Sequence, residues 1–283
     1  MKLWLISDVH LDSHPKNLEL WGLLAKQALR DKPDILVVAG DVCERLDVLH
    51  EGLKIFNALE ALKIYIPGNH DLWCRQESQV DSLKKLEKLL PDVVQANGWH
   101  WLSQNPIVMG DYYLVGSAAW YDYSLMPEGH PFQTEDFAKK QRGSRQWMDG
   151  KWCHFPDQSS ETVDFWLRDR FYQELYTDLS RCPFGKKILL FTHFPFYKEL
   201  LNFTHKDWDF EYFGAFMGSS YYRSLLREFP VTLHGCGHLH RVCDFVSEEG
   251  TRVVMAPIGY LKEWGTDSAE VRLQNVLMRL DLE

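Results

Sequence analysis

The chain has 283 residues, of which 45% are hydrophobic and 25% are charged. This balance is typical of globular proteins and excludes collagen-like, low-complexity and wholly disordered chains. Asp and Glu outnumber Lys and Arg by 40 to 31, a net charge of −9 that disfavours broad binding of nucleic-acid phosphates.

The cysteines and the apolar segments indicate where the protein works. Six cysteines are scattered without a C-x-x-C pair, which indicates reduced thiols rather than a disulfide framework. The apolar run at residues 3–6 is too short for a signal peptide, and no other segment approaches the length of a membrane span. We therefore expect a cytoplasmic protein with no membrane contact.

The first hundred residues alternate short apolar runs with helical patterns. Such alternation indicates parallel strands with helices on the face of the sheet. A further helix is expected to end at Pro91, because proline disrupts a helix interior. The predicted elements are strands over 3–6, 35–39 and 64–66, and helices over 18–29, 49–59 and 82–90.

The rest of the chain predicts hairpins mixed with helices. The turn signals Gly110-Asp111 and Glu249-Gly250 each separate two apolar runs. We find no internal repeat or linker, so we expect a single domain over residues 1–283. The predicted elements are strands over 107–109, 112–115, 187–191, 231–233, 242–246, 252–255 and 271–282, and helices over 162–179 and 221–229.

An aromatic-rich insertion is expected at about residues 118–180, and its part up to residue 150 has no clear periodicity. Two interpretations are open. Its rings line a substrate pocket while Arg142, Arg145 and Lys151 meet a phosphate, or the rings pack the insertion onto the body. The aromatic residues in question are Trp120, Tyr121, Tyr123, Phe132, Trp147 and Trp152.

Five polar clusters each follow directly after a predicted strand. In parallel α/β sheets, ligands bind beyond the carboxyl ends of the strands. Imidazole, amide and carboxylate donors without thiolates suit Mn, Fe or Zn, and seven such groups fit two ions that share a carboxylate. The clusters are Asp8-Val9-His10, Gly40-Asp41, Gly68-Asn69-His70-Asp71, Thr192-His193 and Gly237-His238-Leu239-His240.

In this order, the five clusters resemble the motif set of the calcineurin-like metallophosphoesterase superfamily: D-x-H, G-D, G-N-H-D/E, H and G-H-x-H. The match extends over residues 8–240. The resemblance implies a mixed α/β fold, a four-layer α/β/β/α sandwich of the metallo-dependent phosphatase type. It also implies a dinuclear site between loops at one edge of the sheets.

The resemblance further implies a ligand set for two divalent or mixed-valence transition metal ions (Mn, Fe or Zn). Asp41 would be the carboxylate that bridges both ions. The first ion would be bound by Asp8, His10, Asp41 and His240, and the second by Asp41, Asn69, His193 and His238.

Four residues are expected to act on the substrate. The resemblance implies that His70 contacts the phosphate, together with Asn69, and protonates the leaving oxygen, a task for which an imidazole is suited. A role for His70 as a further metal ligand stays open. Asp71 is expected to orient the imidazole, and Arg45 is a candidate for binding phosphate, although a surface position on the following helix fits it as well.

The function expected from these residues is hydrolysis of a small phosphate ester, preferably a diester, by a hydroxide held between two metal ions. A phosphomonoesterase or protein Ser/Thr phosphatase is the first alternative. A catalytically inactive binding module of the same fold is the second. A nuclease is disfavoured by the acidic charge balance and the lack of a basic stripe, and no protein partner is indicated.

Overall fold

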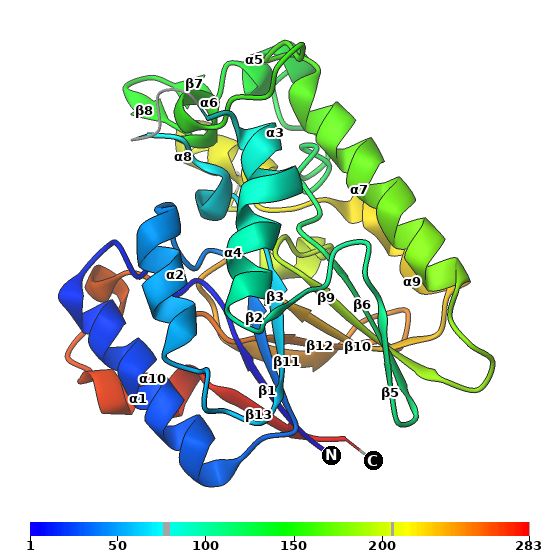
Figure 1. Cartoon of the computed structure of the whole chain (residues 1–283). Helices are drawn as coiled ribbons and strands as arrows, with labels where there is room; N and C mark the ends of the chain where they lie inside the picture. The colour runs from blue at the N-terminus through cyan, green and yellow to red at the C-terminus, as the bar shows by residue number, and fades with distance from the viewer. Residues whose placement is uncertain (76–79, 205–206, 283) are drawn as a thin grey trace.

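Two β-sheets form the middle of the molecule (Figure 1). The computed structural model describes residues 1–75, 80–204 and 207–282. The first sheet has the strand order β13-β1-β2-β3-β4, and its strands are parallel except β13, which pairs antiparallel with β1. Its strands are β1 (Lys2–Ile6), β2 (Ile35–Ala39), β3 (Leu62–Ile66), β4 (His100–Trp101) and β13 (Met278–Asp281).

The second sheet has the order β11-β12-β10-β9-β6-β5. Its four central strands are parallel, and each edge is an antiparallel hairpin, as the two turn signals predict. Its strands are β5 (Ile107–Met109), β6 (Tyr112–Ser117), β9 (Lys187–Thr192), β10 (Val231–Cys236), β11 (Cys243–Val246) and β12 (Arg252–Met255).

The strands β1, β2 and β3 are almost fully buried, which explains their mostly apolar sequences. In β1, Leu3 and Leu5 belong to the core between the two sheets, whereas Trp4 and Ile6 belong to the core under the helices. This alternation follows from the two-residue period of a strand. Both faces of the sheet are therefore fixed by packing.

Helices cover the outer face of each sheet, which gives the expected α/β/β/α sandwich (Figure 1). Within the described residues, no helix combines the length and hydropathy needed to cross a membrane. One outer layer contains α1 (Pro15–Asp31), α2 (Leu46–Lys54), α3 (Ser82–Lys84), α4 (Leu90–Ala96) and α10 (Ala269–Val276), and the other contains α7 (Val163–Ser180) and α9 (Arg223–Glu228).

Two expected boundaries are wrong. Pro91 does not end the helix that begins at Ser82, because a π-helical stretch, Lys85–Leu89, leads into α4. Pro91 then lies in the first turn of α4, where a missing N–H is tolerated. Residues 269–276 are helical rather than extended, because Ser268 caps α10 and its buried side chains recur at helical spacing.

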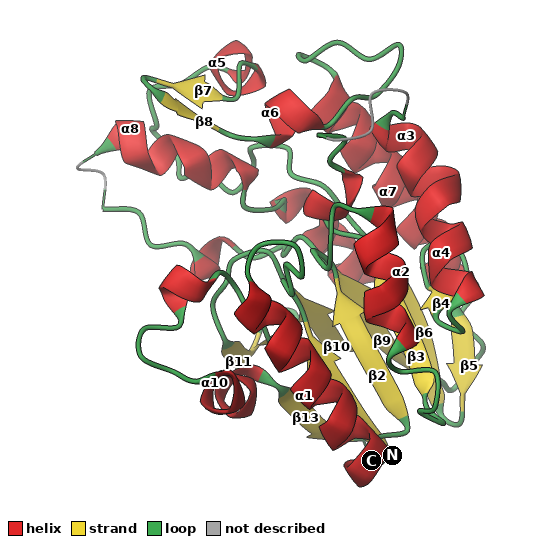
Figure 2. Ribbon diagram, turned by 60° about the vertical axis from the view of Figure 1, so that its left-hand side comes forward, coloured by secondary structure: helices red, strands yellow, loops and turns green. Residues whose placement is uncertain are grey.

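The insertion lies above the carboxyl ends of the strands, and Figures 1 and 2 agree on this placement. Its rings Trp120, Tyr121, Tyr123 and Phe132 are buried in the core, so for these four the packing interpretation holds. The helix α7 belongs to the outer layer described above. The segments above the strand ends are α5 (Thr134–Ala138), β7 (Gln141–Arg142), β8 (Arg145–Gln146), α6 (Asp149–Trp152) and α8 (Trp208–Glu211).

Candidate metal centre

The backbone turns sharply where the strands deliver the predicted ligands. Five of the seven predicted metal ligands have positive φ angles, a conformation that costs free energy in residues other than glycine. Such strain persists where surrounding contacts hold it, and it often marks functional segments. The five are Asp8 (52°), His10 (47°), Asp41 (55°), His238 (73°) and His240 (47°).

Two glycines allow the loops to approach each other closely. A Cβ atom on Gly68 would lie 2.2 Å from Asp41 Oδ1, and a Cβ on Gly40 would lie 2.4 Å from His193 Nδ1. Neither distance is compatible with a side chain. The glycines of the Gly-Asp and Gly-Asn motifs are therefore required by the packing of the candidate ligands themselves.

One group of candidate ligands consists of Asp8, His10 and His240, whose donor atoms all lie within 4.8 Å of one another. The Nε2 atoms of His10 and His240 are 3.1 Å apart, and Asp8 Oδ1 is 3.4 Å from His240 Nε2. Asp8 is also held by Ser7 Oγ, which donates to its Oδ2.

A second group consists of Asp41, His193 and His238, again within 4.8 Å. His193 Nε2 is 3.4 Å from Asp41 Oδ2 and 3.3 Å from His238 Nδ1, and Asn69 Oδ1 lies 3.1 Å from the same nitrogen. Asp41 also forms a group with His10 and His70. The structure thus brings all seven predicted ligands together, with Asp41 between the two halves.

Three histidines are oriented by hydrogen bonds on the side away from the cluster. His193 Nδ1 lies 2.9 Å from Ala39 O, His238 Nε2 lies 3.1 Å from Phe216 O, and His240 Nδ1 lies 2.7 Å from Glu263 Oε2. These oxygens can only accept, so each of these nitrogens is the donor. The other nitrogen of each ring is left to act as a ligand.

The facing nitrogens fit bound cations. His193 Nε2 and His238 Nδ1 face each other across 3.3 Å. Because the other nitrogen of each ring donates to a carbonyl, a positive charge between the two facing nitrogens, from a proton or a metal ion, stabilises this arrangement. Burial lowers the pKa of His193, but Asp41 outweighs it and raises that pKa to about 9. Burial also lowers the pKa of His240, while Asp8 and Glu263 raise it to about 10. The site therefore favours positive charge between its carboxylates.

Asp149, in the insertion, holds the amide of Asn69. Asn69 Nδ2 donates to Asp149 Oδ1 at 2.9 Å, so the amide oxygen faces the cluster. Trp73 Nε1 donates to the same oxygen at 2.7 Å, and Trp147 Nε1 and the Tyr121 hydroxyl donate to Oδ2 at 2.8 and 3.1 Å. Sequence reasoning missed both Asp149 and Glu263, because neither belongs to a strand-end motif.

Asp71 does not orient His70, which corrects that expectation. Its carboxylate accepts hydrogen bonds from the backbone amides of Asp41, Val42, Cys43 and Gly68, at 2.8–3.0 Å. Burial and the neighbouring Asp41 carboxylate raise the pKa of Asp71 to about 7. Asp71 instead connects the loop after β2 to the loop after β3, and so fixes the backbone that carries Asp41 and Asn69.

His70 lies at the mouth of the cluster. Its ring packs on Trp73, with centroids 3.5 Å apart, and its Nε2 is 3.3 Å from the Tyr260 hydroxyl and 3.9 Å from Asp41 Oδ2. A cavity of about 230 Å³ opens over the cluster. It is lined by Asp41, Asn69, His70, Trp73, Gln146, Trp147, Met148, His238, His240 and Tyr260.

Arg45 is placed outside this cavity, which corrects its candidacy as a phosphate-binding residue. It is exposed at the start of α2, where its guanidinium pairs with Asp47 at 2.5 Å. The described residues that line the cavity do not include Arg45.

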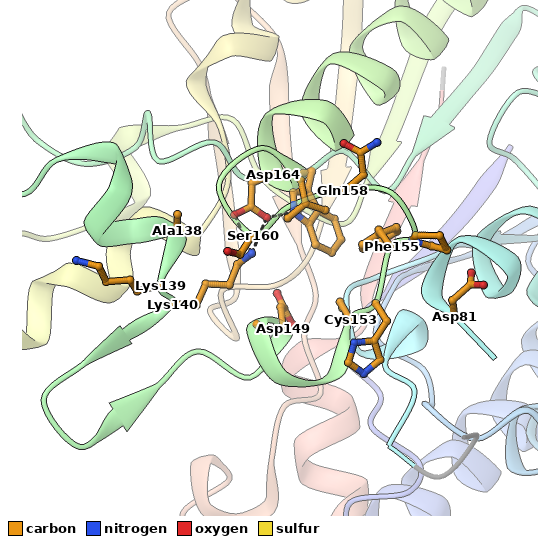
Figure 3. A pocket seen from close by; sticks show the side chains of 15 residues that line it. Asp81, Ala138, Lys139, Lys140, Asp149, Cys153, Phe155, Gln158, Ser160 and Asp164 are labelled. Atoms are coloured by element: carbon orange, nitrogen blue, oxygen red, sulfur yellow. Dashed lines mark hydrogen bonds and ion pairs between the residues drawn. The ribbon is translucent and has the colours of Figure 1, made fainter. Parts of the chain in front are cut away.

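A larger cavity, of about 420 Å³, lies on another side of Asp149 (Figure 3). Lys140 and Asp164 in its wall pair with each other at 2.8 Å, and Asp164 also accepts from Trp120 Nε1 and the Tyr123 hydroxyl. These charged groups are satisfied within the insertion. The cavity over the candidate metal ligands is therefore the candidate active site.

Comparisons with known proteins identify the family. A family model described as calcineurin-like phosphoesterase matches residues 1–242. The acyl-carrier-protein phosphodiesterase PptH of Mycobacterium tuberculosis is 25% identical over 272 residues, which cover 93% of this chain and 79% of the relative.

A solved structure shares the fold. The crystal structure of phosphopantetheinyl hydrolase (PptH) from Mycobacterium tuberculosis matches with a TM-score of 0.79 and 23% identity, over 100% of this chain and 96% of that one. A dimetal phosphatase from Danio rerio matches with a TM-score of 0.48 and 15% identity, over 90% and 86% of the two chains. The chain belongs to the calcineurin-like phosphoesterases, a family of dinuclear metal-dependent enzymes, and is a hydrolase that acts on phosphoric ester bonds.

Proposed function

We propose that the seven clustered side chains hold two divalent or mixed-valence transition metal ions, Mn, Fe or Zn. One ion is assigned to Asp8, His10, Asp41 and His240, and the other to Asp41, Asn69, His193 and His238. The observation that carries this assignment is that Asp41 belongs to donor groups on both sides. The donor set has imidazole, carboxylate and amide atoms without thiolates, which suits these metals.

Two such ions, when bound, supply Lewis acidity to the phosphate and lower the pKa of a water molecule that serves as nucleophile. The chain supplies the geometry and the proton. The water releases one proton to solvent, and its oxygen forms a bond to phosphorus while the bond from phosphorus to the leaving oxygen breaks. His70 gives its proton to that leaving oxygen, and Asn69 and His70 contact the phosphate.

We propose that the physiological substrate is a phosphodiester between a phosphopantetheine arm and a carrier protein. The support is the similarity to a relative named acyl-carrier-protein phosphodiesterase. This replaces the expectation of a small substrate, because the diester sits on a protein. A cytoplasmic location is part of the proposal, since the six cysteines are scattered along the chain without a C-x-x-C pair.

The substrate assignment is tested with two comparisons. Bis(p-nitrophenyl) phosphate should be hydrolysed faster than p-nitrophenyl phosphate, and a carrier protein loaded with phosphopantetheine should lose the mass of its arm in intact-protein mass spectrometry. A large preference for the monoester contradicts the diesterase assignment. An intact carrier protein after prolonged incubation with active enzyme contradicts the choice of substrate alone.

The role of His70 is tested with His70→Ala. The variant should keep both metal ions and lose about 10²–10⁴-fold in turnover for esters with poor leaving groups, the usual range for a general acid. Esters with good leaving groups should lose much less. A variant that loses one equivalent of metal would show instead that His70 is a ligand.

A further inference from the structure

We propose that Tyr260 is the positioning residue for His70, the role that the sequence pattern assigned to Asp71. The inference rests on the proposed function of His70 as a proton donor. The Tyr260 hydroxyl lies 3.3 Å from His70 Nε2, whereas Asp71 is occupied by four backbone amides. A hydrogen bond to a ring nitrogen fixes the rotation of an imidazole.

Different neighbours restrain the face and the edge of the His70 ring. Trp73 packs against its face, at 3.5 Å between centroids and 32° between planes. Trp73 is itself held by the hydrogen bond from its Nε1 to Asp149. Tyr260 contacts the ring edge that faces Asp41. Without the hydroxyl, the ring keeps its stacking but loses the contact that sets which edge faces the cluster.

Tyr260 is placed rigidly enough for this task. Its ring stacks on His10, with centroids 4.4 Å apart and planes 21° apart. Its backbone N–H donates to Glu263 Oε2 at 2.9 Å, and Glu263 N–H donates to Tyr260 O at 2.8 Å. The same Glu263 oxygen accepts from His240. The short helix Leu261–Glu263 thus fixes Tyr260 relative to two candidate metal ligands.

Proton transfer from His70 depends on where the Tyr260 hydroxyl holds the imidazole. Proton transfer requires the imidazole within hydrogen-bond reach of the leaving oxygen, and a misplacement of about 1 Å in an active site can cost about 10²-fold in rate. The demand is greatest when the leaving oxygen is strongly basic. A loss of positioning should therefore appear as increased sensitivity to the leaving group.

The test uses Tyr260→Phe, which keeps the stacking on His10 and removes only the hydroxyl. Turnover is measured on aryl methyl phosphodiesters whose leaving phenols rise in pKa from nitrophenol to phenol. We expect a loss of about tenfold for the phenyl ester and less than about twofold for the nitrophenyl ester, a part of the general-acid contribution. In the His70→Ala background, Tyr260→Phe should cost nothing further, because coupled residues are non-additive.

Tyr197→Phe is the matched control. The Tyr197 hydroxyl also pairs with a histidine, at 2.9 Å from His234 Nδ1, but both residues are buried in the core and neither lines the cavity over the cluster. The control removes the same chemical group from the same kind of contact. It should lower the melting temperature without changing the leaving-group dependence.

Three results overturn the assignment of Tyr260. They are an equal loss across the ester series, losses that multiply in the His70→Ala background, and a fall in bound metal in Tyr260→Phe. A different result separates the two proposals. If His70→Ala itself leaves the leaving-group dependence unchanged, the proposed function of His70 fails, and the role of Tyr260 falls with it.

Discussion

The strand-end loops and the segments that cover them contribute in different ways to the site. The loops after β1, β2, β3, β9 and β10 supply all seven candidate ligands. The insertion and the loop after β12 supply groups that contact them from outside: Asp149 binds Asn69, and Glu263 binds His240. Tyr260, in the same loop after β12, contacts His70. The loops at the sheet edge thus supply the ligands, while part of the orientation of those ligands comes from segments that fold over the edge.

This division explains why the candidate ligands are predictable from the sequence, whereas the groups that orient them are not. A ligand and its strand are adjacent in the sequence, so the motif and its structural context are seen together. Asp149 lies 80 residues from the Asn69 amide that it holds. Ala39 and Phe216 contribute only backbone carbonyls, for which no residue type gives a signal. Changes in the two regions should therefore have different consequences.

The largest effect is expected at the shared carboxylate. Asp41→Asn should lower bound metal from two equivalents toward none and reduce turnover of bis(p-nitrophenyl) phosphate by about 10³-fold or more, because both ions lose the same charge. Metal analysis by mass spectrometry after dialysis checks this. Asp47→Asn, on the exposed side of α2, is the control. Retention of two tightly bound ions in Asp41→Asn would contradict the bridging role.

The covering insertion should have a smaller, more selective effect. Asp149→Asn places an NH₂ group among four donors and should weaken binding of one metal ion by about 10–100-fold, as is usual for groups behind a ligand. Titration with Mn²⁺, followed by activity and by calorimetry, measures it. Asp164→Asn alters another buried carboxylate of the insertion and should destabilise the protein without this change. Equal metal affinities for both variants would contradict a role of Asp149 in orienting Asn69 for metal binding.

His234 is a core histidine and differs from the histidines of the cluster in its surroundings and its pKa. It lies inside β10, between the hydroxyls of Thr192 and Tyr197, and burial lowers its pKa to about 3 from 6.5. The unfolded chain binds the proton first, so this contribution to stability is complete above pH 6.5 and is lost as the pH falls toward 3.

Between pH 7 and pH 5 this loss should be about 2 kcal/mol in the free energy of unfolding. Urea denaturation in the presence of a chelator measures it, so that metal binding does not contribute. His234→Asn should show a flatter pH dependence and an unchanged metal stoichiometry. An identical pH slope in both proteins would refute the account of His234.

Glu263→Gln is expected to have the smallest effect. Gln keeps an acceptor oxygen for His240 Nδ1 but removes the charge, so affinity for the ion assigned to His240 should fall by about tenfold. Metal competition with a fluorescent chelator is sensitive enough to detect this. Glu199→Gln, in an ion pair with Arg223, is the control and should bind metal normally. No difference between these two variants would argue against Glu263 as an orienting group.

The sequence predicts the sheets well because buried strands appear as short continuous apolar runs. The runs ending at Ile6, Ala39 and Ile66 are apolar on both faces and become β1, β2 and β3. The errors lie where tertiary contacts decide. Residues 269–276 are apolar at two periods at once, and packing against α1 selects the helix.

The candidate ligands are predictable for the same reason, and the acid–base assignment only in part. His70 reaches the mouth of the cluster as expected. Its neighbour Asp71 does not touch it, because backbone amides from two loops converge on that carboxylate. Adjacent residues in a tight turn point in different directions, so a sequence motif does not predict whether their side chains are in contact. The single-domain organisation stays a prediction.

The central claim is that seven side chains from the strand ends hold two metal ions through a shared Asp41. Anomalous diffraction from crystals of the protein grown with Mn²⁺ tests it most directly. The account predicts two anomalous peaks about 3.5–4 Å apart, with Asp41 bonded to both and His193 and His238 on the same ion. A single peak, or a pair of ions that Asp41 does not bridge, would contradict it.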